Sequence, residues 1–545
     1  MDRQRMLTAL QSQDADWDIV VIGGGATGLG TALDAASRGY RVALLEAHDF
    51  AQGTSSRSTK LIHGGVRYLR QGQINMVRHS LHERGRLRRN APHIVHSRKF
   101  VIPSYRLGGR LYFYAGMKAY DLLAGRLGFE GSQLLSTSQT LAALPTLNSQ
   151  NLHGGVAYAD GQFDDARLAI ALAQTCVDHG GVVLNHAPVV RLLSHGGRVA
   201  GAVVRDEDSQ SEFEVRGRVV VNATGVFGDS IMELDTTTEK SAEPAARRPH
   251  IVASQGTHIV LPYDFLPSNT AMLIPHTDDS RVLFAIPWHG RTLFGTTDQR
   301  VEHIALEPRP LDSEIDYLLE HAGRFLTKRP ERSDILSVFA GLRPLVGSSS
   351  QTAASRSGGS SPPATASLSR EHEIYTSPSG LVTIIGGKWT TYRKMGQDVV
   401  DIAARVGQLN KAQSQTAELY LHGANADLPP AKWDTQSNDP LAIYGSDRGP
   451  LLELAKREST WSKLLSPELP YSAAQVAWAV EQEMARDIDD VLARRMRALL
   501  LDARASLAAA PATAAIMQQL LGRSDAWREQ QIEAYRQLVD NYLPA

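Results

Sequence analysis

The chain has 545 residues, with 57 Lys and Arg against 58 Asp and Glu and a formal net charge of −1. This length is enough to bury a large core in two or three domains, and the balanced charge excludes a globally basic surface of the kind that binds nucleic acid. The single cysteine, Cys176, excludes an internal disulfide and a thiolate metal cage, and it predicts a reducing compartment.

Residues 1–18 carry no apolar targeting segment, and no run in the chain reaches the length of a membrane-spanning helix. We therefore expect a cytoplasmic protein, and peripheral contact with the inner face of the cytoplasmic membrane stays open. No metal site is predicted.

Residues 18–46 are predicted to form a βαβ unit that binds a dinucleotide. A β-branched apolar run indicates a buried parallel strand, and a helical pattern follows before a second strand ends on Glu46. Between strand and helix, G-x-G-x-x-G spacing places Gly23 for the tight turn, Gly25 for the approach of a pyrophosphate and Gly28 for close helix packing. The Glu46 carboxylate can accept both ribose hydroxyls and would repel a 2′-phosphate, so the unit predicts NAD or FAD and disfavours NADP.

The next segment, residues 47–69, is rich in small hydroxyl side chains and has poor periodicity, which is typical of a loop near a ligand or at the surface. Its hydroxyls can hydrogen-bond the phosphates and ribityl chain of a cofactor, and the alternative is a solvated loop. A histidine beside paired glycines follows, which indicates tight backbone around a planar or charged ligand. The residues that we single out are Thr54, Ser55, Ser56, Ser58, Thr59, His63, Gly64, Gly65 and Arg67.

Two basic segments come next. Residues 73–90 look helical, and we interpret their charges as a solvated face. Residues 105–129 mix aromatic and basic side chains and are the best candidate for a surface that meets anionic lipid, with an ordinary half-buried helix as the alternative. The pair Asp164–Asp165 then precedes a helical pattern, which predicts N-capping.

Strand patterns dominate the middle of the chain. The stretch VVVNATG is predicted to be a strand that ends on Ala223, Thr224 and Gly225. Residues 250–300 look like a second, mostly antiparallel sheet, and His258 lies in one of its strands.

The strand pattern resumes on either side of a low-complexity segment. Residues 334–346 place Arg343 at the end of an apolar strand, where a guanidinium needs an anion or a partner. Residues 347–369 have few apolar anchors and predict a mobile loop. After a further strand, residues 386–391 open a helix whose N–H groups can face a ligand, with the positive charge of Lys388 beside them.

From about residue 410 the pattern becomes helical, with apolar residues at three- and four-residue spacing. The pair Arg494–Arg495 in this region is expected to form surface salt bridges, and an anion site is the alternative.

Four separated motifs carry a family resemblance. GGGATGLGTALDAASRG at residues 23–39 and TSSRSTKLIHGGVRYL at residues 54–69 resemble the FAD-dependent glycerol-3-phosphate dehydrogenases, a family grouped with D-amino-acid oxidase and sarcosine oxidase. The motif GTHIV at residues 256–260 and GGKWTTYRK at residues 386–394 follow in the family's order. The resemblance therefore extends over about residues 17–540 of the chain.

The resemblance implies an α/β (α+β) fold with an FAD-binding Rossmann-like βαβ domain, an antiparallel-sheet substrate domain and a C-terminal α-helical cap domain. The implied boundaries are residues 17–75, 150–235 and 370–405 for a discontinuous FAD-binding domain, 76–149 and 236–346 for the substrate domain, and 410–545 for the cap.

The implied reaction is oxidation of sn-glycerol 3-phosphate to dihydroxyacetone phosphate, by hydride transfer from C2 to flavin N5. The electrons would pass to a membrane quinone, and a homodimer is expected. Alternatives are an oxidase that uses oxygen and releases peroxide, a related flavin amine oxidase, and a non-catalytic dinucleotide-binding sensor.

The substrate's chemistry selects the predicted catalytic residues. A phosphate dianion needs fixed positive charge, which Arg67, Arg343 and Lys388 supply. Either His63 or His258 can accept the hydroxyl proton, because a histidine pKa lies near working pH. We expect His258 and the three cations to touch substrate. The predicted FAD contacts are Gly23, Gly25, Gly28, Glu46, Thr54, Ser55, Ser56, Thr59, Leu61, His63, Gly64, Gly65, Ala223, Thr224, Gly225, Gly387, Lys388 and Thr390.

Overall fold

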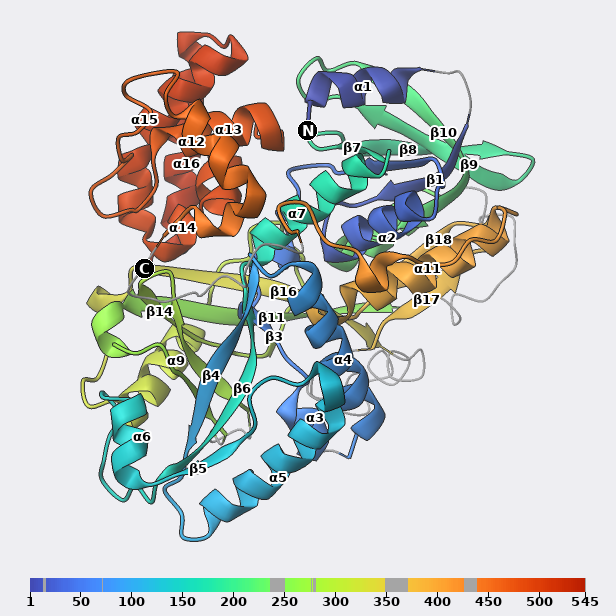
Figure 1. The fold of residues 1–545 in the computed structure, drawn as a ribbon. Helices are drawn as coiled ribbons and strands as arrows, with labels where there is room; N and C mark the ends of the chain where they lie inside the picture. The colour runs from blue at the N-terminus through green and yellow to red at the C-terminus, as the bar shows by residue number, and fades with distance from the viewer. Residues whose placement is uncertain are drawn as a thin grey trace.

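The computed structural model describes residues 1–12, 16–70, 72–235, 250–275, 277, 281–347, 371–425 and 439–544, without the side chains of Arg67, Arg70 and His250. Within these ranges the chain forms two large sheets and a C-terminal helical domain (Figure 1). The predicted α/β fold with an antiparallel second sheet and a helical cap is thereby confirmed. Residues 348–369 of the predicted mobile loop lie outside the described residues.

The first sheet is built around the predicted βαβ unit. Strand β1 (Trp17–Ile22) pairs in parallel with β2 (Val42–Leu45) and with β10 (Glu212–Asn222). All four residues of β2 are buried, which explains its continuous apolar run. The other strands of this sheet are β7 (Val182–Leu184), β8 (Val189–His195), β9 (Arg198–Arg205), β17 (Glu373–Thr376) and β18 (Val382–Ile385). The helices beside it are α1 (Arg3–Gln11), α2 (Ala26–Ser37), α7 (Asp165–Asp178) and α11 (Tyr392–Val406) (Figure 1).

The second sheet is antiparallel except where β12 pairs with β4. In sheet order its strands are β15 (Gln299–Arg300), β11 (His250–Pro262), β14 (Arg291–Gly295), β13 (Leu283–Trp288), β12 (Ala271–Ile274), β4 (Val95–Pro103), β6 (Gly155–Phe163) and β3 (Leu61–Ile62). Strand β16 (Ser337–Gly347) pairs with β11, and β5 (Gln133–Leu135) pairs with β6.

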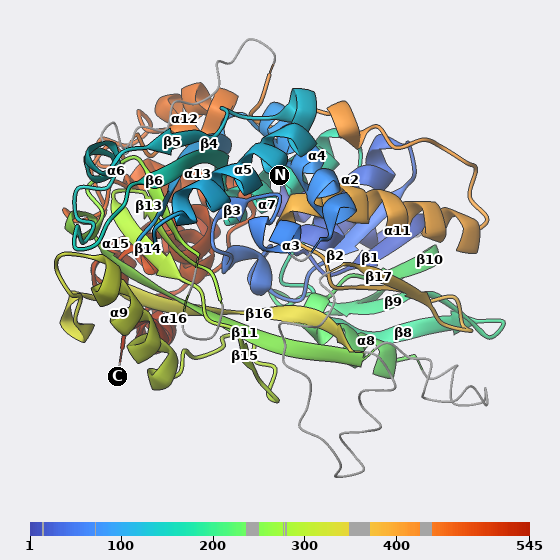
Figure 2. The same cartoon turned by 90° about the horizontal axis from the view of Figure 1, so that it is seen from below.

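The β11–β16 ladder belongs to the second sheet and extends toward the first. Its register places His258 opposite Phe339, and Ser254 opposite Arg343. Figure 2 shows this pair running along the underside of the molecule, from α9 (Asp312–Phe325) toward α8 (Gly228–Glu233) beside the first sheet. Residues of the two predicted substrate strands are therefore brought near the end of the dinucleotide-binding unit.

Helices α4 (Ile74–Asn90), α5 (Gly109–Ala124) and α6 (Thr137–Ala143) pack on the β4–β6 side of the second sheet, α3 (Val66–Arg70) packs on α4 and α5, and α9 packs on β11 and β14. The prediction that α4 presents a solvated basic face is wrong for Arg84, which is buried. Its Nη1 lies 2.8 Å from Oδ1 of Asp160 on β6, and this carboxylate compensates the buried charge. The aromatic ring of Phe129 also lies 4.1 Å from the Arg84 guanidinium carbon.

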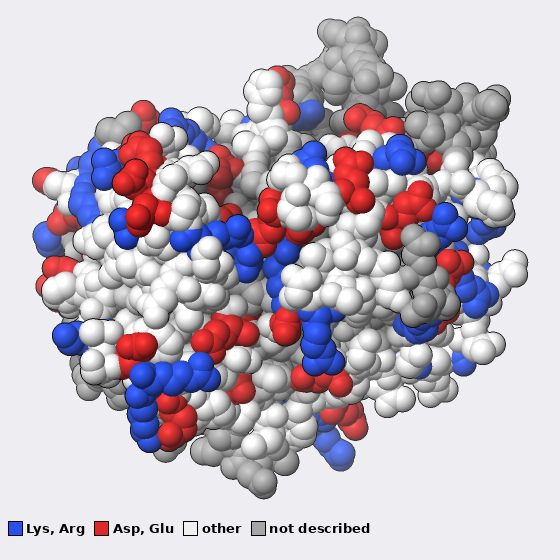
Figure 3. Space-filling view, turned by 90° about the horizontal axis from the view of Figure 1, so that it is seen from above, with Lys and Arg blue, Asp and Glu red and all other residues white. Residues whose placement is uncertain are grey.

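The C-terminal domain packs its helices on one another and on the second sheet. Its helices are α12 (Arg448–Leu454), α13 (Ala473–Glu483), a π-helical turn (Asp490–Arg495), α14 (Ala498–Leu501), α15 (Ala503–Leu521) and α16 (Asp525–Val539). Leu499 and Leu501 of α14 share one buried core with Phe339 of β16. On the face above this domain and α1, basic and acidic side chains of the described residues are interspersed (Figure 3).

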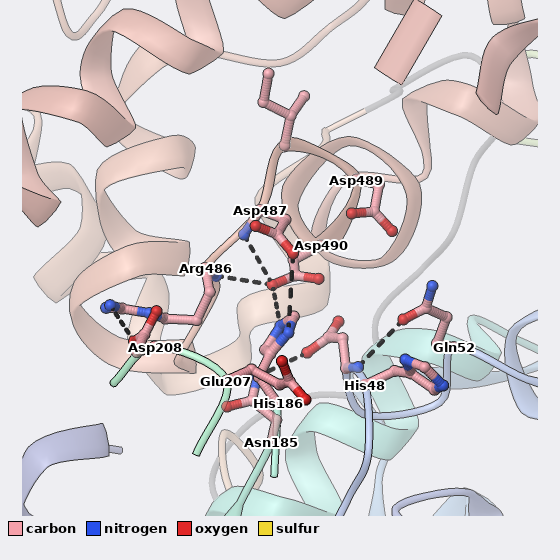
Figure 4. Close-up of polar contacts among 12 residues, drawn as sticks. His48, Gln52, Asn185, His186, Glu207, Asp208, Arg486, Asp487, Asp489 and Asp490 are labelled. Carbon is pink, nitrogen blue, oxygen red and sulfur yellow. Dashed lines mark hydrogen bonds and ion pairs between the residues drawn. The ribbon is translucent and has the colours of Figure 1, made fainter. Parts of the chain in front are cut away.

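The Arg494–Arg495 pair is buried, so the predicted surface salt bridges are wrong. Arg494 Nε lies 2.5 Å from Oδ2 of Asp49, and Arg495 Nη2 lies 2.8 Å from its Oδ1. Asp49 follows β2 closely, so these ion pairs join the C-terminal domain to the dinucleotide-binding unit. At the same junction, His186 Nε2 lies 2.9 Å from Oδ2 of Asp490 (Figure 4). Asp49, the carboxylate partner of Arg494 and Arg495, is too distant in sequence for local patterns to predict these ion pairs.

Candidate active site

One cavity of about 880 Å³ brings most of the predicted site residues together. It extends from the β1–α2 turn, past the hydroxyl-rich segment, to the faces of β11 and β16. The predicted residues that line it are Gly23, Gly25, Glu46, Thr54, Ser55, Thr59, Leu61, His63, Gly65, Ala223, Thr224, Gly225, His258, Arg343, Gly387, Lys388 and Thr390. Gly28, Ser56 and Gly64 do not line it, and the side chain of Arg67 on α3 lies outside the described part of the chain.

The β1–α2 turn has the shape of a phosphate cradle. Gly23 has φ +107°, and a Cβ there would lie 2.7 Å from the carbonyl oxygen of Ala223. Gly25 is the N-cap of α2 and gives the first-turn N–H groups no side-chain cap, and Gly25, Ala26 and Thr27 line the cavity. A Cβ on Gly28 would lie 1.8 Å from the Gly23 carbonyl oxygen, so this glycine serves the close packing of helix on strand.

Glu46 closes β2 at the same end of the cavity. Its carboxylate accepts the backbone N–H of Gly24 at 2.5 Å and that of His48 at 2.9 Å. Burial raises the pKa of Glu46, and the two N–H donors offset this only in part. A carboxylate has about four lone-pair positions, so two remain for the hydroxyls of a ribose.

The hydroxyl-rich segment is folded into the protein, so its reading as a solvated loop is wrong. Ser55 Oγ accepts the N–H of Ala26 at 2.9 Å, and Thr54 Oγ1 donates to the Leu342 carbonyl at 2.5 Å. Ser58 Oγ donates to Asp165 at 2.7 Å, and Ser56 is buried. These contacts fix the backbone of the segment along the cavity wall.

His258 lies on β11, only 2% exposed, at the far end of the cavity. Its Nε2 is 2.9 Å from Oγ1 of Thr59, and its ring stacks on Phe339 at a centroid distance of 4.9 Å. Burial, then the charges of Lys60 and Arg343, hold the pKa of His258 well below its usual 6.5. The imidazole is therefore neutral at working pH.

Arg343 lies on β16, and its side chain is 24% exposed. Its Nη2 donates to the Thr297 carbonyl at 3.1 Å and to Thr296 Oγ1 at 3.3 Å, and its Nη1 is 3.7 Å from Asp298. A Cβ on Gly256 would lie 2.2 Å from Nη2, so only glycine leaves room for the guanidinium there.

The loop after β18 brings a second cation to the cavity. Lys388 Nζ lies 4.3 Å from the centroid of the Tyr68 ring. The neighbouring Thr390 accepts the backbone N–H of His63 on its Oγ1 at 3.3 Å, and Trp389 Nε1 donates to the Ser55 carbonyl at 2.8 Å. This loop is thus fastened to the hydroxyl-rich segment opposite.

Sequence reasoning missed several lining residues. They are Tyr68, Thr296, Thr297 and Asp298. Tyr68 directly follows Arg67 in the HGGVRYL string, and the other three form the end of GTTD. The first string is part of a motif of the family resemblance, which was the available signal for Tyr68, but a strand or helix pattern does not show which side chains face a cavity.

Comparisons with known protein families cover almost the whole chain. The family described as FAD dependent oxidoreductase matches residues 18–393, and the family described as C-terminal domain of alpha-glycerophosphate oxidase matches residues 382–528.

Curated relatives agree with these matches. A probable mitochondrial glycerol-3-phosphate dehydrogenase of Caenorhabditis elegans is 38% identical over 568 residues, covering 99% of this chain and 75% of the relative. A mitochondrial glycerol-3-phosphate dehydrogenase of Arabidopsis thaliana is 39% identical over 526 residues, covering 90% of this chain and 80% of the relative.

Solved structures share the fold. The glycerol-3-phosphate dehydrogenase of Bacillus halodurans, solved in complex with FAD, matches with a TM-score of 0.77 and 28% identity over 99% of this chain and 98% of the other. The L-α-glycerophosphate oxidase of Mycoplasma pneumoniae, at 16% identity and a TM-score of 0.53, shares the fold over 74% of this chain and 97% of the other. None of the helices in the described ranges combines the length and hydropathy that crossing a membrane requires.

Proposed function

Because the chain belongs to the FAD-dependent glycerol-3-phosphate dehydrogenases, we propose that the residues of this cavity oxidise sn-glycerol 3-phosphate to dihydroxyacetone phosphate. The observation that carries the proposal is the presence of Arg343, Lys388 and a neutral His258 in one cavity with the phosphate cradle. Two cations suit a phosphorylated substrate, and the neutral imidazole suits proton acceptance.

The residues present fit FAD. Gly23, whose Cβ would collide with the Ala223 carbonyl, allows the tight turn, and the positive N-terminal end of α2 lines the cavity, where it would receive a pyrophosphate. Glu46 would take the ribose hydroxyls, and Thr390 and Gly387 would line the opposite end of the cofactor. When bound, FAD would supply the two-electron acceptor for the hydride of substrate C2.

The two cations of the cavity would bind the phosphate and so orient C2. The guanidinium of Arg343 is held by backbone carbonyls and Thr296, which limits its motion before substrate arrives. Lys388 is fixed beside the Tyr68 ring. We propose that Arg67 on α3 adds a third positive charge.

We propose His258 as the base that accepts the hydroxyl proton. The Thr59 hydroxyl orients the ring through Nε2, and Phe339 supports its face. His63 would instead contact the cofactor, because Thr390 fixes its backbone at the opposite wall. A well-placed base contributes roughly 10²–10⁴-fold to the rate.

An anaerobic titration tests the reaction. Glycerol 3-phosphate should bleach the flavin absorption at one equivalent, whereas glycerol and glycine derivatives should not. Bleaching by a glycine derivative instead would favour the amine-oxidase alternative, and bound flavin that no donor bleaches would favour a non-catalytic sensor.

We propose a quinone as electron acceptor, reached from an anionic membrane surface through α5. Leu107, two residues before α5, is 88% exposed, and Leu122, in the last turn of α5, is 82% exposed, with Lys118 between them. Tyr112 is exposed and also lines the cavity, so the cavity reaches this helix. An apolar, basic surface at the mouth of a redox cavity suits a lipid-dissolved acceptor.

Flotation with vesicles tests this surface. Wild-type protein should float with anionic vesicles and less with neutral ones, and Leu122→Asp should reduce flotation without loss of bound FAD. Mixing the anaerobically bleached enzyme with quinone or with oxygen then identifies the acceptor, since rapid peroxide formation would favour the oxidase alternative. The homodimer and the cytoplasmic location stay predictions, which sedimentation and cell fractionation can check.

A further inference from the structure

Lys60 is a buried lysine of the STKLIHGG motif for which the proposed reaction gives no role. Burial, opposed by Asp165, lowers the pKa of Lys60 to about 7, so its ammonium group is charged in the acidic pH range. It is 0% exposed, and its Nζ lies 2.6 Å from Oδ2 of Asp165 and 2.6 Å from the Ser56 carbonyl oxygen. An ammonium group is very costly to bury unless it is paired and hydrogen-bonded in this way.

Two connections lead from Lys60 to His258. The preceding residue, Thr59, holds His258 by the hydrogen bond to Nε2. The Lys60 ammonium also lies 5.2 Å from the centroid of the Phe339 ring, the same ring on which His258 stacks at 4.9 Å. Because β11 and β16 place His258 and Phe339 directly opposite each other, this arrangement is built into the sheet.

The C-terminal domain completes the cluster around Lys60. Asp165, at the start of α7, also accepts Nη2 of Arg497 at 2.9 Å, and its Oδ2 accepts the Ser58 hydroxyl. Both neighbours of Thr59 are thus tied to one buried carboxylate. The hydroxyl that orients His258 therefore sits in a segment that cannot shift unless this cluster breaks.

The charges that face His258 come from two elements. Lys60 lies before β3, and Arg343 lies on β16 with Asp298 at 3.7 Å from it. Strand β14, on the other side, presents Gly295 to the ring and brings no charge. Both cations disfavour protonation of the imidazole, and burial acts in the same direction.

We propose that Lys60 is a positioning residue, which through Thr59 and Phe339 keeps His258 oriented and uncharged so that the ring can take the substrate's hydroxyl proton. The proposal rests on the proposed function of His258 as base. Lys60 itself touches neither substrate nor the reacting atoms.

The pH dependence of kcat/KM tests the proposal. In Lys60→Met the buried cation is gone and Asp165 remains, so the acidic limb of the profile should move up by about one pH unit, with about tenfold lower kcat/KM below it. Lys60→Arg should restore most of the wild-type profile. Lys394→Met, which removes an ion-paired lysine of α11 outside the cavity, should leave the profile unchanged.

Bound FAD, measured by flavin absorption, shows whether each variant folds. If Lys60→Met does not retain FAD, Asp165→Asn provides the opposite perturbation: it removes the negative charge, and the acidic limb should move down. An unmoved limb in whichever of these variants retains FAD would overturn the proposal.

His258→Gln separates the two claims. If this variant loses the acidic limb while the Lys60 and Asp165 variants leave it in place, His258 is the base and Lys60 has no positioning role. If His258→Gln keeps both the limb and the activity, the proposed base is wrong, and the role of Lys60 is wrong with it.

Discussion

Replacing Arg343 with alanine tests whether this guanidinium binds the substrate phosphate. The side chain is 24% exposed, so its charge is only partly screened by solvent. A charge-assisted contact of this kind contributes about 2–3 kcal/mol, which corresponds to a loss of about 30- to 150-fold in kcat/KM. The loss should appear mainly in KM, while FAD retention stays near that of the wild type, because the glycine cradle lies at the other end of the cavity.

Asp298 makes this prediction sharper. Its carboxylate lies 3.7 Å from Arg343 Nη1, so removing the arginine leaves a negative charge near the incoming phosphate. The double variant Arg343→Ala, Asp298→Asn should therefore recover roughly fivefold of the lost kcat/KM. Arg332 is a half-buried arginine of the turn before β16 that pairs with Asp312 and Asp316 and does not line the cavity. Its replacement, Arg332→Ala, is the matched control and should change activity by less than about twofold. Equal loss of FAD and of activity in Arg343→Ala would show that the phosphate site is misplaced.

Three further predictions follow from close contacts and one raised pKa. Gly256→Ala should raise KM and retain FAD, because its Cβ would lie 2.2 Å from Arg343 Nη2 and displace the guanidinium. Steady-state kinetics and flavin absorption check this prediction, and an unchanged KM would contradict it. Gly28→Ala should instead abolish FAD retention, because its Cβ would lie 1.8 Å from the Gly23 carbonyl oxygen. A variant that is yellow and active would show that the β1–α2 turn does not bind the cofactor as proposed. Asp490 overcomes the effect of burial and raises the pKa of His186 from 6.5 to about 9, so this histidine stabilises the fold fully below pH 6.5 and loses its contribution as the pH rises toward 9. His186→Asn should therefore lower the free energy of unfolding by up to about 3 kcal/mol below pH 6.5, and this loss should fade by pH 9. Thermal unfolding midpoints of the variant and the wild type, measured across this pH range, check the prediction.

Local patterns were sufficient to predict the central βαβ unit of the first sheet, and together with the family resemblance they predicted most of the residues that line the cavity. The glycine spacing located Gly23 because turn, helix start and strand are adjacent in sequence, and family order placed His258 and Lys388. The roles assigned to individual site residues, and the discontinuous domain boundaries, stay predictions. Ser56 was grouped with its hydroxyl neighbours, yet it does not line the cavity, since an irregular segment has no period that separates inward from outward side chains.

Buried charges were the systematic failure. Arg84 and Arg495 belong to basic clusters, and a basic cluster in a helical pattern normally indicates a solvated face. Their partners, Asp160 and Asp49, come from distant parts of the chain, so no local pattern predicts that these arginines form buried ion pairs. Such pairs add little net stability compared with apolar side chains of similar size. Removing one partner leaves the other charge buried and unpaired, which typically lowers the free energy of unfolding by about 3–5 kcal/mol.

The register of β11 and β16 explains why the cation and the imidazole face one space. Residues directly opposite in an antiparallel ladder point to the same side, so Gly256 with Gly341 lies between the level of His258 and that of Arg343. Four residues of strand span roughly 13 Å, and the central glycine pair leaves that stretch of the sheet without a side chain. Both glycines line the cavity, and the space where each side chain would be is occupied: Arg343 Nη2 lies 2.2 Å from a Cβ on Gly256, and the Arg57 carbonyl oxygen lies 2.8 Å from a Cβ on Gly341. The glycine at position 256 therefore lets the Arg343 guanidinium lie over the strand that carries His258, so the cation and the imidazole face the same part of the cavity, and a side chain at this position would displace the guanidinium.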